Sequence, residues 1–134
     1  MDHRSVLGNS DAVIVLGHGS RLKEANGPLF DVARMVSERM GGITAGAAFL
    51  QIASPTLEDE VSRLRGLGAR TIRIVPFFLY PGAHVLHDIP DEVKRLGSLF
   101  PDIELILTEH LGVHPLMADI VADRVMKTVR AEGK

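Results

Sequence analysis

The sequence predicts a small α/β domain in which four parallel strands carry helices on both faces. Apolar runs typical of buried parallel strands alternate with stretches whose apolar residues recur at helical spacing. This alternation implies a parallel sheet with right-handed crossovers. A length of 134 residues, 46% of them hydrophobic and 24% charged, suits one globular domain. We therefore expect a single domain over residues 1–134, with residues 1–11 as a loose lead-in.

The first strand is predicted over Ala12–Leu16, because this run is apolar without interruption. A helix is predicted from about Pro28 to Met40, with Asn26 as its cap and Pro28 in its first turn. Gly41 and Gly42 are expected to end it. One face of this helix carries the apolar residues Leu29, Val32, Ala33, Val36 and Met40.

The second strand, Ile43–Leu50, consists mostly of small residues. The next helix has two possible starts. Thr56 and Asp59 have capping-box spacing, whereas Ser54 would serve as the cap if Pro55 held the first helical position. The sequence leaves both starts open. In either case the buried stripe comprises Leu57, Val61 and Leu64.

The third strand starts at Thr71, and Pro76 is placed near its C-terminal end because proline donates no ladder hydrogen bond. A helix follows over about Pro90–Leu99, with Val93 and Leu96 facing inward. The last strand, Ile103–Leu107, contains Glu104 and is expected at an edge. The final helix starts near Pro115, and its apolar face carries Met117, Val121, Val125 and Val129.

The most economical arrangement of these units is a flavodoxin-like sheet with strand order 2-1-3-4. The first and third strands are then neighbours, and the connections that leave them diverge to opposite faces. Ligands of open α/β sheets bind at such a switch point. Two loops end there, Gly17–Arg21 and Tyr80–His84, so His18 and His84 are expected to flank one crevice. A homodimer would shelter an edge of so small a sheet.

Composition excludes several classes of function. A net charge of −2 without a basic cluster gives no basis for binding nucleic acid. The lack of cysteine excludes disulfides, thiolate metal sites and cysteine nucleophiles. No apolar stretch approaches the ~18 residues of a membrane-spanning helix, and the N-terminus lacks the apolar centre of a signal peptide. A cytoplasmic protein is therefore expected, in which His3 is solvated.

Histidines after strands carry the chemical prediction. Imidazole is a frequent ligand of first-row transition metals and titrates near neutrality. Two imidazoles without a thiolate would leave coordination positions open, which suits an ion that is passed on rather than retained. A hydrolytic zinc site built from His84, His87 and Asp88 is a weaker alternative, because no His-Glu-x-x-His motif is present. A phosphate-binding site near Ser20 and Arg21, at the start of the first helix, is a further alternative.

An ordered set of motifs resembles the small sirohydrochlorin chelatases, the single-domain class II chelatases of the CbiX type. The match runs from residue 12 to about residue 118. Its motifs are Gly17-His18-Gly19-Ser20-Arg21, Ala48-Phe49-Leu50, Val75-Pro76-Phe77-Phe78-Leu79, Gly82-Ala83-His84, Asp88-Ile89-Pro90 and Leu111-Gly112-Val113-His114-Pro115.

The resemblance implies insertion of a divalent metal into sirohydrochlorin, with Co²⁺ first and Ni²⁺ or Fe²⁺ as alternatives, and with no permanently bound cofactor. It implies a homodimer and a chelatase-type fold. His18 and His84 would bind the metal and accept protons from the macrocycle, with His18 as the usual candidate base. The resemblance implies that Ser54 and the segment from Leu79 to His84 line the tetrapyrrole site, and Arg21 would hold carboxylates of the substrate. The predicted substrate-binding residues are Ser20, Arg21, Gln51, Ser54, Leu79, Tyr80, Pro81, Gly82 and Ala83.

The chemistry of insertion agrees with these residues. Two pyrrole N–H protons leave when the metal enters, so a neutral imidazole is a sensible general base. An apolar wall of Phe77, Phe78 and Tyr80 would suit a flat ring. Many members of the family carry glutamates at the positions of Gln51 and Ser54, which are uncharged here. That departure motivates a second hypothesis, a carrier that binds the tetrapyrrole or the metal without catalysing insertion.

Overall fold

The structure is a computed structural model that describes residues 7–132, with side chains as far as Val129. Its sheet is formed by β1 (Asp11–Gly17), β2 (Thr44–Phe49), β3 (Thr71–Pro76) and β4 (Glu104–Leu107). All three strand pairs are parallel, and the strand order is β2-β1-β3-β4. The predicted fold class and strand order are confirmed.

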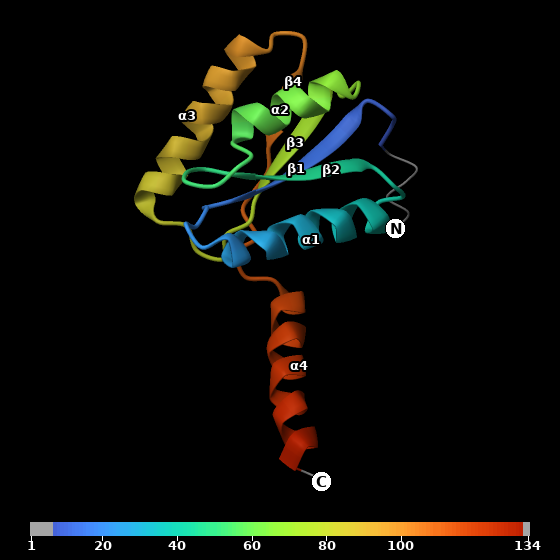
Figure 1. Ribbon diagram of the computed structural model, residues 1–134, viewed down its shortest axis with the longest axis vertical. Helices are drawn as coiled ribbons and strands as arrows, with labels where there is room; N and C mark the ends of the chain where they lie inside the picture. The colour runs from blue at the N-terminus through green and yellow to red at the C-terminus, as the bar shows by residue number, and fades with distance from the viewer. Residues whose placement is uncertain (1–6, 133–134) are drawn as a thin grey trace.

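Three helices cover the sheet and a fourth leaves it. Helix α1 (Lys23–Arg39) packs on one face, against β1 and β2. Helices α2 (Leu57–Gly66) and α3 (Ala83–Leu99) lie on the opposite face, over a core that includes Ile14, Leu16, Ile72 and Leu96. Helix α4 (Pro115–Glu132) projects away from the sheet (Figure 1). Within residues 7–132, no helix is both long and apolar enough to cross a membrane.

The second helix begins as the capping-box spacing predicts. The Thr56 hydroxyl accepts from the Asp59 N–H at 3.1 Å, and the Asp59 carboxylate accepts from the Thr56 N–H at 3.3 Å. Ser54 is therefore not the cap. The predicted stripe Leu57, Val61 and Leu64 is buried.

Two helices begin earlier than predicted, and both continue through a proline. α1 begins at Lys23, so Pro28 lies beyond its first turn, and α3 begins at Ala83, so Pro90 lies inside it. Proline has a φ angle that suits a helix and removes only one donor. The helices tolerate that loss because packing on the sheet supports them.

These earlier starts change the roles of two residues. Asn26 is not the cap of α1; it lies within the helix, and its side chain bonds Ser20 instead. His84 lies in the first turn of α3 rather than at the end of a loop.

The final helix begins at Pro115 as predicted, but its apolar face packs on no other described element. Val121, Val125 and Val129 are 63%, 54% and 52% exposed. The predicted residues 1–6 of the lead-in, including His3, lie outside the described part of the chain.

Candidate functional site

The two predicted loops emerge at one edge of the sheet. β1 and β3 are adjacent, and Leu16 pairs with Pro76 near their C-terminal ends. Phe77 continues this pairing, because its N–H donates to the Leu16 carbonyl at 2.8 Å. The residues after β1 and those after β3 therefore start side by side, as the strand order predicts.

Glycines and backbone bonds fix the first loop against the end of β2. Gly19 has a φ of +102°, and a Cβ placed there would lie 1.9 Å from the Gln51 carbonyl oxygen. Only glycine permits so close an approach. The Leu50 N–H donates to the Gly17 carbonyl at 3.0 Å, and the Gln51 N–H donates to the His18 carbonyl at 3.2 Å. The backbone of His18 is consequently held in place.

Asn26 ties the other end of this loop to α1. Its Oδ1 accepts from the Ser20 N–H at 2.9 Å, and its Nδ2 donates to the Ser20 carbonyl at 2.8 Å. The Ser20 hydroxyl accepts from the Leu22 N–H at 3.1 Å. Ser20 thus shapes the loop, and the loop is braced on both sides of His18.

The imidazole of His18 has two neighbours. Its Nε2 lies 3.0 Å from Nε2 of Gln51, and its ring meets that of Phe78 edge-on at a centroid distance of 6.4 Å. The two nitrogens lie within hydrogen-bond distance, and the tautomer of the ring sets which of them donates. An imidazole nitrogen that carries no proton can take a proton or bind a metal ion once Gln51 releases it.

On one side of His18 lies a cavity of about 580 Å³ between α2 and α3. We call it the acidic cavity, because four carboxylates and one guanidinium line it, a net charge of −3 apart from His18. Its volume is in the usual range for small-molecule sites. The ionisable residues that line it are His18, Glu58, Asp88, Asp91, Glu92 and Arg95.

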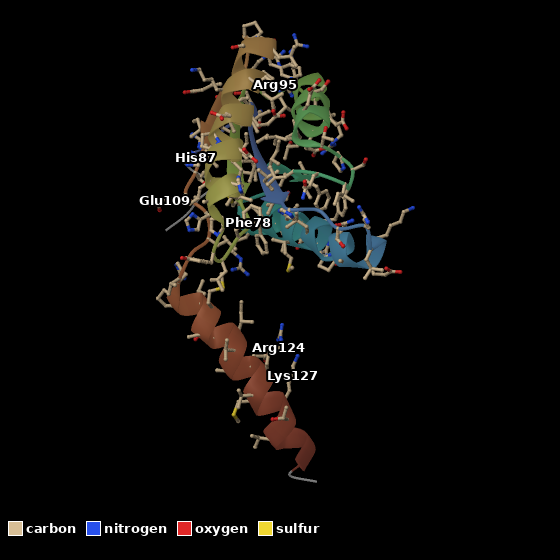
Figure 2. All side chains as sticks on the ribbon, turned by 90° about the vertical axis from the view of Figure 1, so that its left-hand side faces the viewer. Phe78, His87, Arg95, Glu109, Arg124 and Lys127 are labelled. Carbon is tan, nitrogen blue, oxygen red and sulfur yellow. The ribbon has the colours of Figure 1, made fainter. Side chains whose placement is uncertain are left out.

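Arg95 joins the two helices that form this cavity (Figure 2). It donates to Glu92 within α3 at 2.8 and 2.9 Å, and to Glu58 of α2 at 2.8 Å. The hydrogen bond from Arg95 lowers the pKa of Glu92 below its ordinary value. Arg95 therefore fixes two of the carboxylates, while Asp88 and Asp91 make no side-chain ion pair among the described residues.

On the other side of the first loop lies a hollow of about 480 Å³ beside the start of α1. We call it the basic hollow, since Arg21 and Lys23 are the charged side chains that line it within the described part of the chain. Ser20, Asn26 and Ser54 also line it. A smaller hollow of about 320 Å³, lined by His18, Ser20, Asn26 and Phe77 among others, adjoins it. His18 thus stands between a negative and a positive surface.

The second predicted loop lies further out. Tyr80 is 92% exposed and Leu79 58% exposed, so Tyr80 forms no wall with Phe77 and Phe78. Gly82 is the residue that precedes α3, and Pro81 is half-buried. His84 is exposed. Among the described residues, no hydrogen bond or ring contact joins His84 to His18.

The register of α3 nevertheless relates His84 to the acidic cavity. Residues four apart lie on the same side of a helix, so His84 lies one turn before Asp88 on the cavity side. The predicted pair is therefore brought to the same edge of the sheet; both histidines are exposed, His18 lines the acidic cavity, and His84 lies one helical turn before Asp88. In the described part of the chain no group of three His, Asp or Glu side chains forms a metal site, so the zinc alternative gains no support.

Of the carboxylates in the acidic cavity, the sequence singles out Asp88 alone, and the role of Asn26 in the loop was missed. The pattern over Pro90–Leu99 predicts inward residues only. The i, i+3 spacing of Glu92 and Arg95 was visible in the sequence and is typical of a helical ion pair. Their link to Glu58 depends on tertiary packing and had no sequence signal.

Comparison with solved structures assigns this parallel sheet to the chelatase-type folds. The crystal structure of the sirohydrochlorin chelatase of Bacillus subtilis subspecies spizizenii in complex with cobalt superposes with a TM-score of 0.78 at 28% identity, covering 88% of this chain and 50% of that one.

The family model CbiX matches residues 12–128, and the chain belongs to this family. It is 34% identical over 119 residues to the chloroplastic sirohydrochlorin ferrochelatase of Arabidopsis thaliana, covering 89% of this chain and 53% of that protein. It is 30% identical over 124 residues to the sirohydrochlorin cobaltochelatase of Methanosarcina acetivorans, covering 87% of this chain and 95% of that protein. The chain thus spans about half the length of the Arabidopsis relative.

Proposed function

We propose that this protein is a sirohydrochlorin chelatase, which inserts a divalent metal ion into the tetrapyrrole. The observation that carries the proposal is the position of His18, an imidazole on a braced loop between the acidic cavity and the basic hollow. Family membership and the names of relatives such as the Methanosarcina cobaltochelatase support the same reaction.

The reaction exchanges one divalent cation for two pyrrole protons. The acidic cavity attracts M²⁺, whereas the carboxylates of the macrocycle are drawn to Arg21 and Lys23 in the basic hollow. His18 Nε2 accepts a pyrrole proton or ligates the incoming ion after Gln51 gives up its hydrogen bond. His84 at the rim is proposed as a second metal ligand and proton acceptor.

The proposed substrate surface extends over both loops. Ser20, Arg21, Gln51 and Ser54 lie on the side of the first loop, and the segment from Leu79 to Ala83 lies on the side of the second. The exposed apolar side chains of Leu79 and Tyr80 would meet the flat ring rather than the protein core.

Co²⁺ is the proposed metal, with Fe²⁺ and Ni²⁺ as alternatives. Relatives are named for both cobalt and iron. Imidazole and carboxylate donors accept most late first-row ions, so supply in the cell governs the choice. We also propose that the protein is cytoplasmic and works as a homodimer.

An insertion assay with sirohydrochlorin and each metal in turn tests the function. We expect the spectrum of the metallated product to grow faster with the protein than in buffer, and His18→Ala to slow it by about 100-fold or more. His84→Ala is expected to reduce the rate as well. His87→Ala is the matched control on α3 and should retain the rate. Equal rates in His18→Ala and the unaltered protein would contradict the role of His18.

The second candidate is a carrier that binds without catalysing. It is favoured by the amide of Gln51, which lies 3.0 Å from His18 Nε2 and is uncharged, whereas a carboxylate there would attract a cation. A carrier would bind sirohydrochlorin in a spectroscopic titration, but metallation would proceed no faster than in buffer.

A further inference from the structure

Ile52 has a strained backbone conformation in the loop between β2 and α2. Its φ of +71° lies in the left-handed region, and within residues 7–132 no other residue except glycine has a positive φ. The Ala53 N–H donates to the Gln51 carbonyl at 2.7 Å, which closes a three-residue γ-turn around Ile52. A β-branched residue fits this turn poorly, because its Cβ crowds the backbone. Stability alone would favour glycine or asparagine at this position.

Backbone hydrogen bonds on both sides of the turn hold it in place. The Gln51 N–H donates to the His18 carbonyl at 3.2 Å, and the Gln51 carbonyl packs against the first loop. At the other end, the Phe49 N–H donates to the Pro55 carbonyl at 2.9 Å and closes the base of the loop. The surrounding structure therefore imposes the strain on Ile52, as is typical of binding and catalytic sites.

The side chain of Ile52 contributes little to the core. It is 60% exposed and belongs to neither of the two core clusters. It lines the basic hollow together with Arg21, Lys23 and the exposed ring of Phe30. The hollow thus combines cationic groups with apolar side chains. This combination suits a ligand that is apolar over its faces and anionic at its periphery.

We propose that Ile52 is a substrate-binding residue, whose side chain packs on the face of the sirohydrochlorin ring while Arg21 holds a carboxylate at the edge of the ring. The inference rests on the proposed function and adds a residue that lies outside the motifs of the family resemblance. The strained turn directs an apolar side chain away from the core and into the basic hollow. Ile52 therefore lowers the stability of the free protein and strengthens substrate binding.

A titration with sirohydrochlorin in the absence of metal tests this contact. Ile52→Asn relieves the strain, because asparagine tolerates the left-handed region, and it removes the apolar contact. We expect the dissociation constant to rise about 10-fold, while the melting temperature stays the same or rises. Ile52→Val keeps a β-branched apolar side chain and should bind within about threefold of the unaltered protein. Leu67→Asn, at a similarly exposed apolar residue that ends α2, is the matched control and should bind normally.

Salt dependence separates the apolar contact from the charged one. The weakening of binding in Ile52→Asn should be the same at low and high salt, whereas the weakening in Arg21→Ala should shrink as salt rises. Normal binding by Ile52→Asn would overturn the inference and leave the proposed function intact. A fall of several degrees in the melting temperature of Ile52→Asn would do the same, because it would assign the side chain a structural role. Failure of the unaltered protein to bind sirohydrochlorin would overturn both.

Discussion

The acidic cavity and the basic hollow lie on opposite sides of one short loop, yet they differ in charge and in construction. The acidic cavity is formed by two helices that Arg95 links through Glu58 and Glu92. The basic hollow is formed by the end of the first loop, the start of α1 and residues 52–54, with Arg21 and Lys23 among its lining residues. Metal insertion brings together a cation and a polyanionic ring, which require surfaces of opposite sign. Under the proposed function, this difference explains how one histidine would serve both substrates.

The largest expected effect comes from the loop between the regions. Gly19→Ala places a methyl group against the Gln51 carbonyl at a positive φ, so we expect a loss of about 2–4 kcal/mol in the free energy of unfolding and loss of insertion. Denaturant unfolding measures the first and the insertion assay the second. Gly97→Ala in α3 has open space and should be neutral or slightly stabilising. Unchanged stability in Gly19→Ala would show that the loop is not braced as described.

Neutralising carboxylates of the acidic cavity should weaken binding of the metal ion without weakening binding of sirohydrochlorin. Asp88→Asn together with Asp91→Asn is expected to raise KM for the metal about 10-fold, because two unpaired carboxylates no longer attract the cation. KM for sirohydrochlorin should stay the same or fall. Steady-state kinetics at low and high salt provide the measurement, and the difference should shrink at high salt. An unchanged KM for the metal would show that the acidic cavity does not attract the metal ion.

The converse change concerns the basic hollow. Arg21→Ala should raise KM for sirohydrochlorin several-fold, roughly 3–10-fold, because one partner for a ring carboxylate is lost. KM for the metal should remain unchanged. Arg34→Ala, a change of the same type on the exposed side of α1, provides the control. If Arg21→Ala changed the metal KM instead, the division of labour between the two regions would be wrong.

The smallest effect concerns acid stability of the cavity wall. The pKa of Glu92 is lower in the folded protein than in the unfolded chain, because Arg95 donates to its carboxylate. The resulting stabilisation is present above the unfolded pKa of about 4.3 and is lost as pH falls through the folded pKa. Arg95→Met should therefore lose less stability than the unaltered protein as the pH falls. Thermal melts of the two proteins between pH 3 and pH 7 measure this loss, and an equal loss in both would contradict the prediction.

The strand order was predictable from the alternation of strands and helices, and the edge position of β4 from Glu104. Apolar periodicity predicted the buried residues of α1, α2 and α3, whereas the equally periodic face of α4 is exposed. The Thr56 cap was one of two open choices, and side-chain geometry decided it. The starts of α1 and α3 were missed because Pro28 and Pro90 suggested helix boundaries. Both helices instead continue past their proline, because packing on the sheet stabilises them. The position of α4 had no sequence signal, since an amphipathic pattern does not identify the surface that it covers.

Within the site, His18 was predictable from its place after a buried strand, but its neighbours were only partly so. Gln51 was named as a candidate without its contact to the imidazole, which depends on the fold of the loop around Gly19. Glu58 and Arg95 belong to separate helices, and only tertiary structure joins them. The role of His84 stays a prediction. The structure places it in the first turn of α3, because this helix begins before Pro90.

The central claim is that His18 performs the insertion step where the two regions meet. The most direct measurement takes His18→Ala and follows sirohydrochlorin binding and metal insertion in the same sample. The account predicts that the ring still binds, through the basic hollow, while product formation falls to the rate in buffer. Product formation at the rate of the unaltered protein would contradict it.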